Sequence, residues 1–271
     1  MPRTLGDILA RNRGKLPAVD LYYLLAHAIG RNREFIITHP EYRLGIGPLC
    51  RWIRMKRRRL RGIPAAYLTG EKEFYGLVFK VNCHTLIPRP ETELIVDEVV
   101  RRKPESLLDV GTGSGCIALA VARHLPLCRI TAVDISKKAL AVAALNSSRL
   151  GTAGITFKRS DYFNALSPQH FDIIVSNPPY VREGDVERLS PEVAEHEPSV
   201  ALYGGRDGLH AYNIILRNAR DFLAPGGVLV LEISPEIASA LQQLAGFYAY
   251  SIDRLVRDFS GHERMMVLSP V

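Results

Sequence analysis

From residue 91 to the C-terminus, short apolar segments typical of buried strands alternate with longer segments typical of amphipathic helices. Parallel strands need crossover connections, usually helices, so this order predicts an α/β fold with a doubly wound, mostly parallel sheet of seven strands. The last two strands are joined by the tight segment DFSGHE, so one of them should run antiparallel. The expected strands are residues 106–111, 129–135, 155–160, 171–176, 228–233, 248–255 and 263–269, and the expected helices are 93–102, 114–125, 136–151, 207–223 and 235–246.

A different pattern occupies the first third of the chain. Capping and helix-breaking residues predict four helices before residue 62, followed by a β-hairpin that turns near Tyr75 and Gly76. The sequence therefore predicts a small helical domain at residues 1–70, a β-hairpin linker at 71–90 and an α/β domain at 91–271. The expected helices are residues 5–13 after the cap Thr4, 17–29 before Gly30, 33–39 after the cap Asn32, and 48–61 before Gly62.

The excess positive charge lies in the same first third. Residues 1–82 contain 16 Lys or Arg and 6 Asp or Glu, whereas residues 83–271 contain 19 and 22. The densest run, RWIRMKRRRLR at residues 51–61, has seven basic residues in eleven. Such a run attracts phosphate groups or an acidic partner through its long-range electric field. The alternative is an ordinary solvated helix face whose apolar residues are turned inward.

Several classes of protein are disfavoured by the composition. No apolar run approaches the roughly 20 residues needed to span a bilayer, so no membrane association is expected. The N-terminus lacks the apolar core of a signal peptide, although its Arg content leaves a mitochondrial leader as an alternative. The four cysteines form no CxxC pair and have no His at metal-binding spacing. We therefore expect a cytoplasmic protein without a metal site.

The segment LLDVGTGSGCIAL, residues 107–119, joins the first strand of the sheet to its helix. Its glycines allow a sharp backbone turn and leave room for a ligand against the helix N-terminus. The dinucleotide fingerprint places its third glycine one position later, where this chain has Cys116. A plain tight turn is the alternative for this loop taken alone. The loop contributes Gly111, Thr112, Gly113, Ser114 and Gly115 as candidate cofactor-binding residues.

Acidic residues at the ends of three neighbouring strands support a nucleoside-containing ligand. Asp134 ends the second strand, 19 residues after Gly115, where a carboxylate can accept both hydroxyls of a ribose. Asp109, just before the glycines, can reach the amino group of a methionine moiety. Asp161 can accept from an adenine amino group, and Tyr162 offers a flat face to the ring, although a turn beside a core aromatic explains this pair equally well. NAD and S-adenosylmethionine both carry such a ribose.

The fourth strand runs into Asn177, Pro178, Pro179 and Tyr180. Neither proline can extend a helix or a central strand, so the motif is a rigid turn at the ligand edge of the sheet. A planar nitrogen is a poor nucleophile because its lone pair is delocalised. Two acceptors, Asn177 Oδ1 and the Pro178 carbonyl, can hold its N–H groups and direct the lone pair towards an electrophile, while Tyr180 stacks on its plane. A turn that merely ends the strand is the alternative.

Several stretches of the sequence match a known family. NPPY after the fourth strand and GxGxG after the first are typical of S-adenosylmethionine-dependent amino-methyltransferases. The stretches that narrow the match are GIPAAYLTGEKEFYGLVFKV (62–81), LIPRPETE (86–93), LDVGTGSGCIALA (108–120), SNPPYV (176–181) and EPSVALYGGRDGLHAYNIIL (197–216). On these residues the chain resembles the peptide chain release factor glutamine methyltransferases, the HemK/PrmC family, over nearly its whole length.

The resemblance implies a class I methyltransferase with a Rossmann-like sheet, whose residues 1–70 recognise the substrate. The implied reaction moves a methyl group from S-adenosyl-L-methionine, leaving S-adenosyl-L-homocysteine, to N5 of the glutamine in the GGQ motif of class 1 release factors. Asn177, Pro178 and Tyr180 would be catalytic, Asn177 would also contact the cofactor, and Pro179, Arg89 and Glu93 would join the substrate site. A monomer without a stable nucleic-acid partner is expected. A mitochondrial leader is less consistent with this resemblance, because the N-terminal domain is itself part of the match.

Two positions depart from the family pattern. The family usually has EIG followed by Gln after the fifth strand, where this chain has EISPEIA with Ser234. It often has Trp where this chain has Tyr162, which gives a smaller stacking face. Both positions lie outside the NPPY motif, so they affect cofactor contacts rather than the chemistry.

Three other functions remain as alternatives. An adenine-N6 methyltransferase acting on DNA or RNA would use the same NPPY logic, with the basic domain as a clamp, but no base-reading module is apparent. A NAD-dependent oxidoreductase is disfavoured by Cys116 and by the absence of a hydride-handling His or Tyr-Lys pair. A non-enzymatic RNA- or ribosome-binding protein would bind RNA in a salt-sensitive way and would leave the NPPY turn unexplained.

Overall fold

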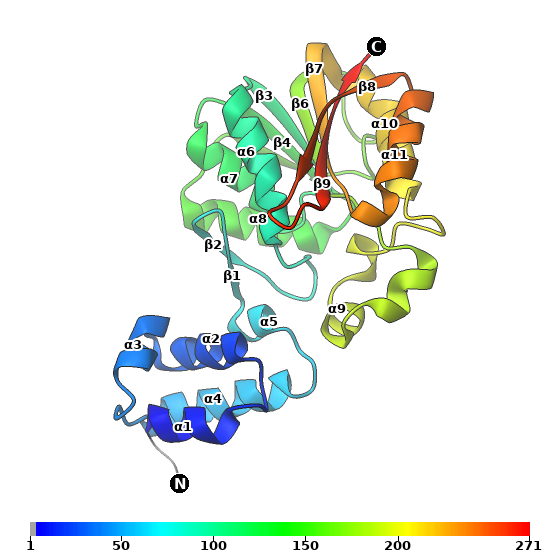
Figure 1. Cartoon of the computed structure of the whole chain (residues 1–271). Helices are drawn as coiled ribbons and strands as arrows, with labels where there is room; N and C mark the ends of the chain where they lie inside the picture. Colours follow the sequence, from blue (N-terminus) through cyan, green and yellow to red (C-terminus); the bar gives the residue numbers. More distant parts are fainter. Residues whose placement is uncertain (1–3) are drawn as a thin grey trace. The chain divides into compact units, whose positions relative to one another are not determined.

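The computed structural model describes residues 4–271. These residues form two compact units, coloured along the chain in Figure 1. Unit 1 contains the chain up to Glu71 together with Ser190–His196, and unit 2 contains Lys72–Leu189 and Glu197–Val271. A short segment that follows the NPPY motif in sequence is therefore packed with the N-terminal helices.

Unit 1 is helical, and its caps follow the sequence. The side chain of Thr4 accepts from the amide of Asp7, Asn32 caps the third helix, and Gly30 ends the second in the left-handed conformation. Apolar residues from α1, α2, α3 and α4 form one core, in which Leu24, Leu25 and Trp52 are buried. The helices are α1 (Leu5–Asn12), α2 (Ala18–Ile29), α3 (Arg33–Thr38), α4 (Ile46–Arg59) and α5 (Ala65–Thr69), and the later segment α9 (Pro191–His196) joins them.

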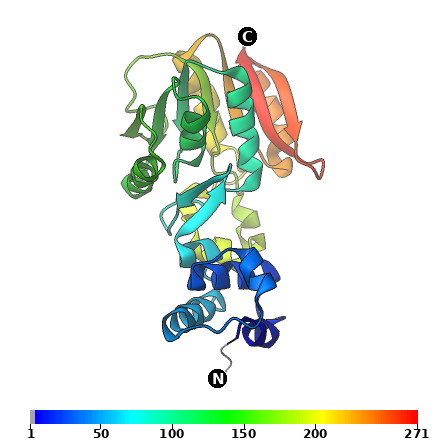
Figure 2. The same cartoon turned by 90° about the vertical axis from the view of Figure 1, so that its left-hand side faces the viewer.

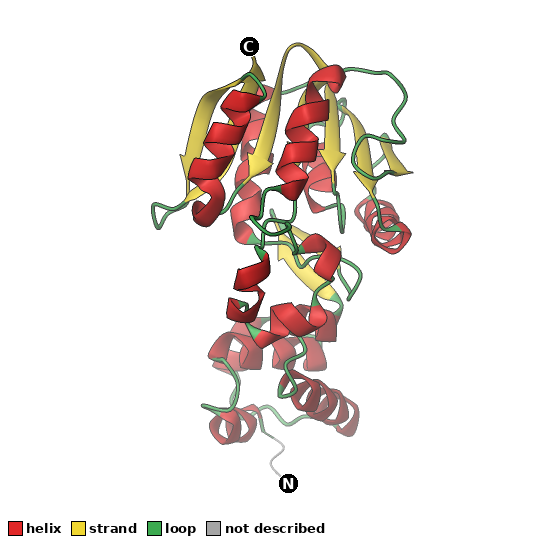
Figure 3. Ribbon diagram, turned by 90° about the vertical axis from the view of Figure 1, so that its right-hand side faces the viewer, coloured by secondary structure: helices red, strands yellow, loops and turns green. Residues whose placement is uncertain are grey.

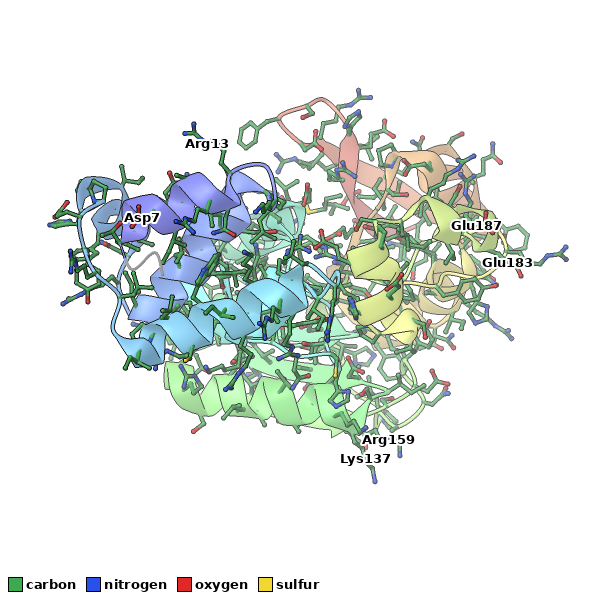
Figure 4. The ribbon with its side chains drawn as sticks, turned by 90° about the horizontal axis from the view of Figure 1, so that it is seen from below. Asp7, Arg13, Lys137, Arg159, Glu183 and Glu187 are labelled. Carbon is green, nitrogen blue, oxygen red and sulfur yellow. The ribbon has the colours of Figure 1, made fainter. Side chains whose placement is uncertain are left out.

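Two expectations for unit 1 were wrong in detail. The fourth helix begins at Ile46 rather than at Pro48, because proline is tolerated in the first turn and does not have to open the helix. The segment after Pro64 contains α5, which the sequence did not predict, since five residues are too few to produce a helical pattern. Asp7 in the first turn of α1 and Arg13 just after its end, both labelled in Figure 4, are exposed. Leu5 and Ile8 of the same helix are buried in the core.

The predicted β-hairpin is present as β1 (Glu71–Phe74) and β2 (Leu77–Lys80), turning at Tyr75 and Gly76. Phe74 and Phe79 enter the core of unit 2. Asn146 fixes the hairpin further, since its side chain accepts from the amide of Lys80 and donates to the carbonyl of the same residue. The segment predicted as a linker is thus largely an integral part of unit 2.

The main sheet of unit 2 has seven strands in the order β5-β4-β3-β6-β7-β9-β8. The first five in this order are parallel, and β9 runs antiparallel to both of its neighbours, which confirms the predicted fold class. Figure 2 shows the final pair in orange and red at one edge of the sheet. The strands are β3 (Ser106–Val110), β4 (Arg129–Asp134), β5 (Ile155–Arg159), β6 (Phe171–Ser176), β7 (Leu223–Glu232), β8 (Tyr250–Arg257) and β9 (Glu263–Pro270).

Helices cover both faces of this sheet, as Figure 3 shows with strands in yellow and helices in red. Alternate residues of β3, β6, β7 and β9 enter two separate cores. Leu107 packs beneath α6 (Glu93–Arg102) and α7 (Cys116–His124), whereas Leu108 packs beneath α10 (His210–Ala219) and α11 (Pro235–Phe247). This alternation is the period of two expected for strands buried on both sides. The helices of unit 2 are α6 (Glu93–Arg102), α7 (Cys116–His124), α8 (Lys137–Leu150), α10 (His210–Ala219) and α11 (Pro235–Phe247), and its short 3-10 helices are η1 (Pro90–Thr92), η2 (Glu183–Arg188), η3 (Ser199–Ala201) and η4 (Arg220–Phe222).

One strand starts earlier than the sequence indicated. The Ala-Pro-Gly-Gly segment at residues 224–227, expected to end the preceding helix, lies within β7. The register between β6 and β7 shifts here, so that Phe171 pairs with Leu223 and Ile173 with Val228. A bulge of this kind accommodates extra residues without breaking the strand.

Charged side chains surround the periphery of unit 2. Figure 4 labels Lys137 at the start of α8 and Arg159 at the end of β5, both on the outer surface. Arg159 donates to the carbonyl of Ile135. Glu183 and Glu187 on η2 likewise point outwards. Within residues 4–271, no helix has both the length and the apolar character that crossing a bilayer demands.

Candidate active site

A cavity lies in unit 2 where β3, β4, β5 and β6 end. Its empty volume is about 1070 Å³, part of which is open to solvent. Open α/β sheets bind ligands at the carboxyl ends of their strands, so this is the place where the fold itself favours a site. The predicted site residues on its wall are Arg89, Gly111, Thr112, Gly113, Ser114, Asp134, Asp161, Tyr162, Asn177, Pro178 and Pro179.

The glycine loop is held in place by the neighbouring strand. The amides of Gly111 and Thr112 both donate to the carbonyl of Val133, at 2.9 Å. Gly113 has a positive φ of 57°, and a Cβ placed there would meet nothing within 4 Å, so its backbone is open to a ligand. At Gly115 a Cβ would lie 2.9 Å from Leu119 Cδ1 and 3.1 Å from Ala143 Cβ. Gly115 is off the cavity wall, and its lack of a side chain permits close packing of α7 and α8.

Asp134 links two segments of the cavity wall. Its Oδ2 accepts from the amide of Gly113 at 2.9 Å, and its Oδ1 accepts from the amide of Ser136 at 2.8 Å. Each carboxylate oxygen keeps a second lone pair for a ligand. Burial raises the pKa of Asp134, which the two amide hydrogen bonds oppose. This geometry leaves a fixed, partly buried acceptor pair facing the cavity.

Asp109 is completely buried, and unlike Asp134 it is absent from the cavity wall. Its Oδ2 accepts from the hydroxyl of Thr112 at 2.6 Å, whereas Oδ1 has no hydrogen-bond partner within residues 4–271. Burial raises the pKa of this carboxyl group to about 7. The hydroxyl of Ser114, which is on the wall, is also buried and unpartnered among the described residues. Of these two unpartnered groups, only the Ser114 hydroxyl is on the wall, where a polar ligand would satisfy it.

Asp161 and Tyr162 follow β5 and reach the cavity from its far side. Tyr162 has a positive φ of 48°, an uncommon backbone conformation for a residue with a side chain. Its ring packs partly against the core shared with α10 and α11, and burial raises the pKa of its phenol. The prediction that these residues meet a ligand is therefore consistent with where the chain places them.

The NPPY turn lies at the end of β6. The hydroxyl of Ser176 donates to the carbonyl of Val110 at 2.7 Å, which ties the end of β6 to the end of β3. Asn177, Pro178 and Pro179 follow on the cavity wall. Tyr180 is not on the wall; it packs partly against the core, and burial raises its pKa to about 12. A direct stacking role for Tyr180 is thus the part of the predicted arrangement that the cavity does not support.

Arg89 and Glu93, two of the residues expected in the substrate site, are placed differently. Arg89 is on the cavity wall, and its Nη2 lies 2.6 Å from Oε1 of the buried Glu197. Glu93 is absent from the wall, and its Oε1 accepts from the amide of Tyr75 in the hairpin at 2.7 Å. Glu93 therefore fixes the hairpin against the start of α6, and its proposed contact with substrate lacks support.

Three residues of the site were not predicted. Thr92 is buried on the cavity wall, and its hydroxyl accepts from Asn177 Nδ2 at 3.2 Å and donates to Glu232 Oε2 at 2.6 Å. Glu197 holds Arg89 and also accepts from the amide of Ile87 at 3.0 Å. The third residue is Glu232, the partner of Thr92. The sequence contains indications of all three, since Thr92 and Glu197 lie in stretches that match the family and Glu232 is a charged residue that ends a buried strand.

Two family models match the chain. The model for the PrmC N-terminal domain matches residues 6–70, and the model for the methyltransferase small domain matches residues 89–195. The first match lies in unit 1, and the second includes the glycine loop, Asp134 and the NPPY turn.

Comparison with known proteins extends these matches. A protein named release factor glutamine methyltransferase from Koribacter versatilis is 37% identical over 256 residues, covering 93% of this chain and 90% of that protein. A bifunctional methyltransferase from Rickettsia prowazekii is 36% identical over 279 residues, covering 94% of this chain and 54% of that protein. The chain thus spans about half the length of the bifunctional relatives that it matches.

The fold is shared more widely. The crystal structure of a methyltransferase from Pyrococcus furiosus is similar with a TM-score of 0.57 and 19% identity, covering 82% of this chain and 98% of that one. At this level of identity the likeness concerns the fold alone. The relative from Koribacter, matched along nearly its whole length, decides the family: this chain belongs to the release factor glutamine methyltransferases.

Proposed function

We propose that this protein transfers a methyl group from S-adenosylmethionine to the side-chain amide nitrogen of the glutamine in the Gly-Gly-Gln motif of class 1 release factors. The observation that carries the proposal is the position of Asn177, whose carboxamide stands on the wall of the same cavity as the glycine loop and Asp134. Membership of the release factor glutamine methyltransferase family supports the choice of substrate. The proposed reaction places this protein in translation termination, in the cytoplasm.

The residues of the cavity fit S-adenosylmethionine. Asp134 would accept from the ribose hydroxyls, Asp161 and Tyr162 would meet the adenine, and the loop from Gly111 to Ser114 would follow the methionine portion. Ser114 Oγ, on the wall and buried without a partner within residues 4–271, would accept from the amino group. Asp109 Oδ1 is also unpartnered in that part of the chain, but Asp109 is absent from the wall, so its direct contact with the amino group lacks support. When bound, this molecule supplies an electrophilic methyl group on a sulfonium sulfur, with S-adenosylhomocysteine as the product.

The NPPY turn would orient the glutamine. A carboxamide nitrogen has little nucleophilicity while its lone pair is delocalised into the carbonyl. Asn177 Oδ1 and the Pro178 carbonyl would accept its two N–H groups, which fixes the plane of the amide and directs its lone pair into the cavity. The prolines hold these acceptors rigidly, since their φ angles are fixed. Tyr180, buried beside the turn, would support it from the core side.

The chemistry needs no strong base. An alkylated amide nitrogen is acidic and loses its proton readily, so positioned acceptors are sufficient. Oriented single contacts of this kind are worth roughly 3–4 kcal/mol of transition-state stabilisation in other enzymes. The position of Asn177 fits such a role, because it lies with the two rigid prolines on the cavity wall.

Unit 1 would provide recognition of the release factor. On α4 and just beyond its end, Arg54, Arg57, Arg58 and Arg61 recur at helical spacing, are exposed and line one shallow depression. No ion-pair partner for these four is found within residues 4–271. An unpaired basic surface of this kind favours an acidic region on the partner.

The experiment that tests the proposal is incubation of the purified protein and labelled S-adenosylmethionine with a purified class 1 release factor, followed by peptide mass spectrometry. We expect one added methyl group, located on the glutamine of the Gly-Gly-Gln motif. Parallel incubations with DNA and RNA should remain unlabelled. Label on adenine, with none on the release factor, would favour a nucleic-acid methyltransferase instead.

A further inference from the structure

A buried chain of hydrogen bonds runs from the NPPY turn to the end of β7. Asn177 Nδ2 lies 3.2 Å from Thr92 Oγ1, and Thr92 Oγ1 lies 2.6 Å from Glu232 Oε2. Thr92 is 2% exposed and Glu232 is 3% exposed, so water does not compete for the contact between them, whereas Asn177 is half-buried on the cavity wall. The three residues come from the turn after β6, the 3-10 helix η1 and β7, which are far apart in sequence.

The donors and acceptors available in these hydrogen bonds determine which way the Asn177 carboxamide faces. An ionised carboxylate can only accept, so the single proton of the Thr92 hydroxyl is given to Glu232. The oxygen of Thr92 must then accept, and only the nitrogen of the Asn177 carboxamide can donate to it. The carboxamide oxygen therefore lies on the side away from Thr92. Within the described part of the chain, no group hydrogen-bonds to Asn177 Oδ1.

We propose that Thr92 and Glu232 are positioning residues, which hold the Asn177 carboxamide with its oxygen towards the methyl-accepting nitrogen. The inference rests on the proposed function, because it assigns these residues a task in orienting the substrate amide. Neither residue needs to touch the substrate or carry a proton from it. Their task is to exclude the flipped carboxamide, which would present two donors to a substrate group that itself donates.

Protonation of Glu232 would remove this constraint. A neutral carboxyl group can donate to Thr92, whose own proton is then free to point at the Asn177 carboxamide and favours the flipped orientation. Burial raises the pKa of Glu232 to about 7, with a further increase from Glu91. The hydrogen bonds from Glu232 through Thr92 therefore hold the Asn177 carboxamide in the required orientation above about pH 7, and this orientation is lost as the pH falls.

The groups that face Glu232 come from every element around it. Glu91 and Arg89 approach from η1 and the residue before it, and Arg264 approaches from β9. Arg264 and Arg89 favour the charged form of Glu232, but their effect is smaller than that of burial. The phenol of Tyr212 on α10 donates to the backbone carbonyl of Glu232 at 2.7 Å, which fixes the end of the strand. Tyr180 and Cys116, both neutral around pH 7, complete the surroundings.

The test compares Thr92→Val, Thr92→Ser and Glu232→Gln with the wild-type protein. Thr92→Val keeps the shape and loses the hydroxyl, Thr92→Ser keeps the hydroxyl, and Glu232→Gln loses the charge. Thr131→Val on β4, away from the cavity, is the matched control for the threonine substitution. Methyl transfer to a purified release factor is measured in the steady state between pH 6 and 9, which gives kcat and KM. Cofactor affinity is measured by calorimetry, and stability by thermal unfolding.

We expect Thr92→Val and Glu232→Gln to lower kcat about tenfold or more, as for loss of one oriented hydrogen bond. KM and the cofactor Kd should change by about twofold at most, and Thr92→Ser should restore most of kcat. Wild-type kcat should rise with pH through about 7, and Glu232→Gln should abolish this step.

Other outcomes would overturn the inference. Asp109 is a second buried acid with a pKa of about 7, so Asp109→Asn is assayed in parallel. If the pH dependence of kcat persists in Glu232→Gln but disappears in Asp109→Asn, the titrating group is Asp109, which would contradict the positioning role of Glu232. Full kcat in a stably folded Thr92→Val variant would also contradict it. Failure of the wild-type protein to methylate the release factor would instead overturn the proposed function itself, and the inference with it.

Discussion

Arg89 and Glu197, separated by more than a hundred positions in the sequence, form an ion pair of 2.6 Å at the cavity. Glu197 is almost completely buried, and its second oxygen accepts from the amide of Ile87. One carboxylate therefore holds both the backbone and the side chain of the LIPRPETE segment. The same segment contains Thr92, so the wall that faces Asn177 depends on this pair.

Replacing Glu197 by Ala should destabilise the protein. The substitution leaves the amide of Ile87 unpaired and Arg89 without its partner, which costs about 1–3 kcal/mol. Thermal unfolding measures the loss, and Asp185→Ala, which removes a more exposed pair with Arg182, serves as the comparison with a smaller expected effect. An unchanged melting temperature for Glu197→Ala would show that the segment is held by other contacts.

Replacing Gly115 of the loop by Ala should cost more stability than replacing Gly113. Gly115→Ala combines a left-handed backbone, at a φ of +81°, with a Cβ 2.9 Å from Leu119 Cδ1, so we expect a loss of stability of about 2–5 kcal/mol. Gly113→Ala meets no atom within 4 Å, so stability should fall by about 1–2 kcal/mol from the left-handed backbone alone. Chemical denaturation measures both. A larger loss for Gly113→Ala than for Gly115→Ala would contradict the packing role of Gly115.

Asp109 makes stability depend on pH. Its folded pKa of about 7 lies above the ordinary value of 3.8, so between these values the folded state binds more protons than the unfolded state. Its contribution to stability is therefore full at low pH and is lost as the pH rises towards 7. Asp109→Asn removes the buried charge while keeping an acceptor for Thr112. We expect the melting temperature of the variant to exceed that of the wild type by about 2–4 °C or more at pH 8 and by less at pH 5.

The basic surface on α4 should affect recognition rather than chemistry. Replacing Arg54, Arg57, Arg58 and Arg61 together by Gln should raise KM for the release factor and weaken its dependence on salt. The value of kcat at saturation and the affinity for S-adenosylmethionine should remain within about twofold, since these side chains lie outside the cavity. Unchanged KM and salt dependence would exclude this surface from recognition.

Local chemistry explains why much of the fold could be predicted. Thr4, Asn32 and Gly30 specify helix ends through interactions within a few residues, and the alternation of strands with helices requires parallel pairing. The strand ends then bring the glycine loop, Asp134 and Asn177 to one edge, because parallel strands end on the same side. These parts of the site follow from residues close together in sequence and from one rule of topology.

The remaining parts depend on contacts between distant segments. Thr92 and Glu232 are 140 positions apart, and no local pattern indicates that they meet. Glu93 accepts a hydrogen bond from the amide of Tyr75 in the hairpin, a partner that sequence spacing does not identify. The packing of α9 with unit 1 follows from contacts such as the 2.7 Å pair between Arg59 and Glu192. Such pairings are set by the tertiary structure and stay hidden in a single sequence.

The rate of methyl transfer by an Asn177→Ala variant tests the central claim most directly. The variant removes the carboxamide that would hold the glutamine nitrogen while leaving Asp134 and the glycine loop in place. A single-turnover assay with a release factor, combined with calorimetric titration of the cofactor, separates chemistry from binding. We predict a normal cofactor affinity and transfer slowed about a hundredfold or more. Transfer at the wild-type rate would contradict the role of Asn177 and the account built on it.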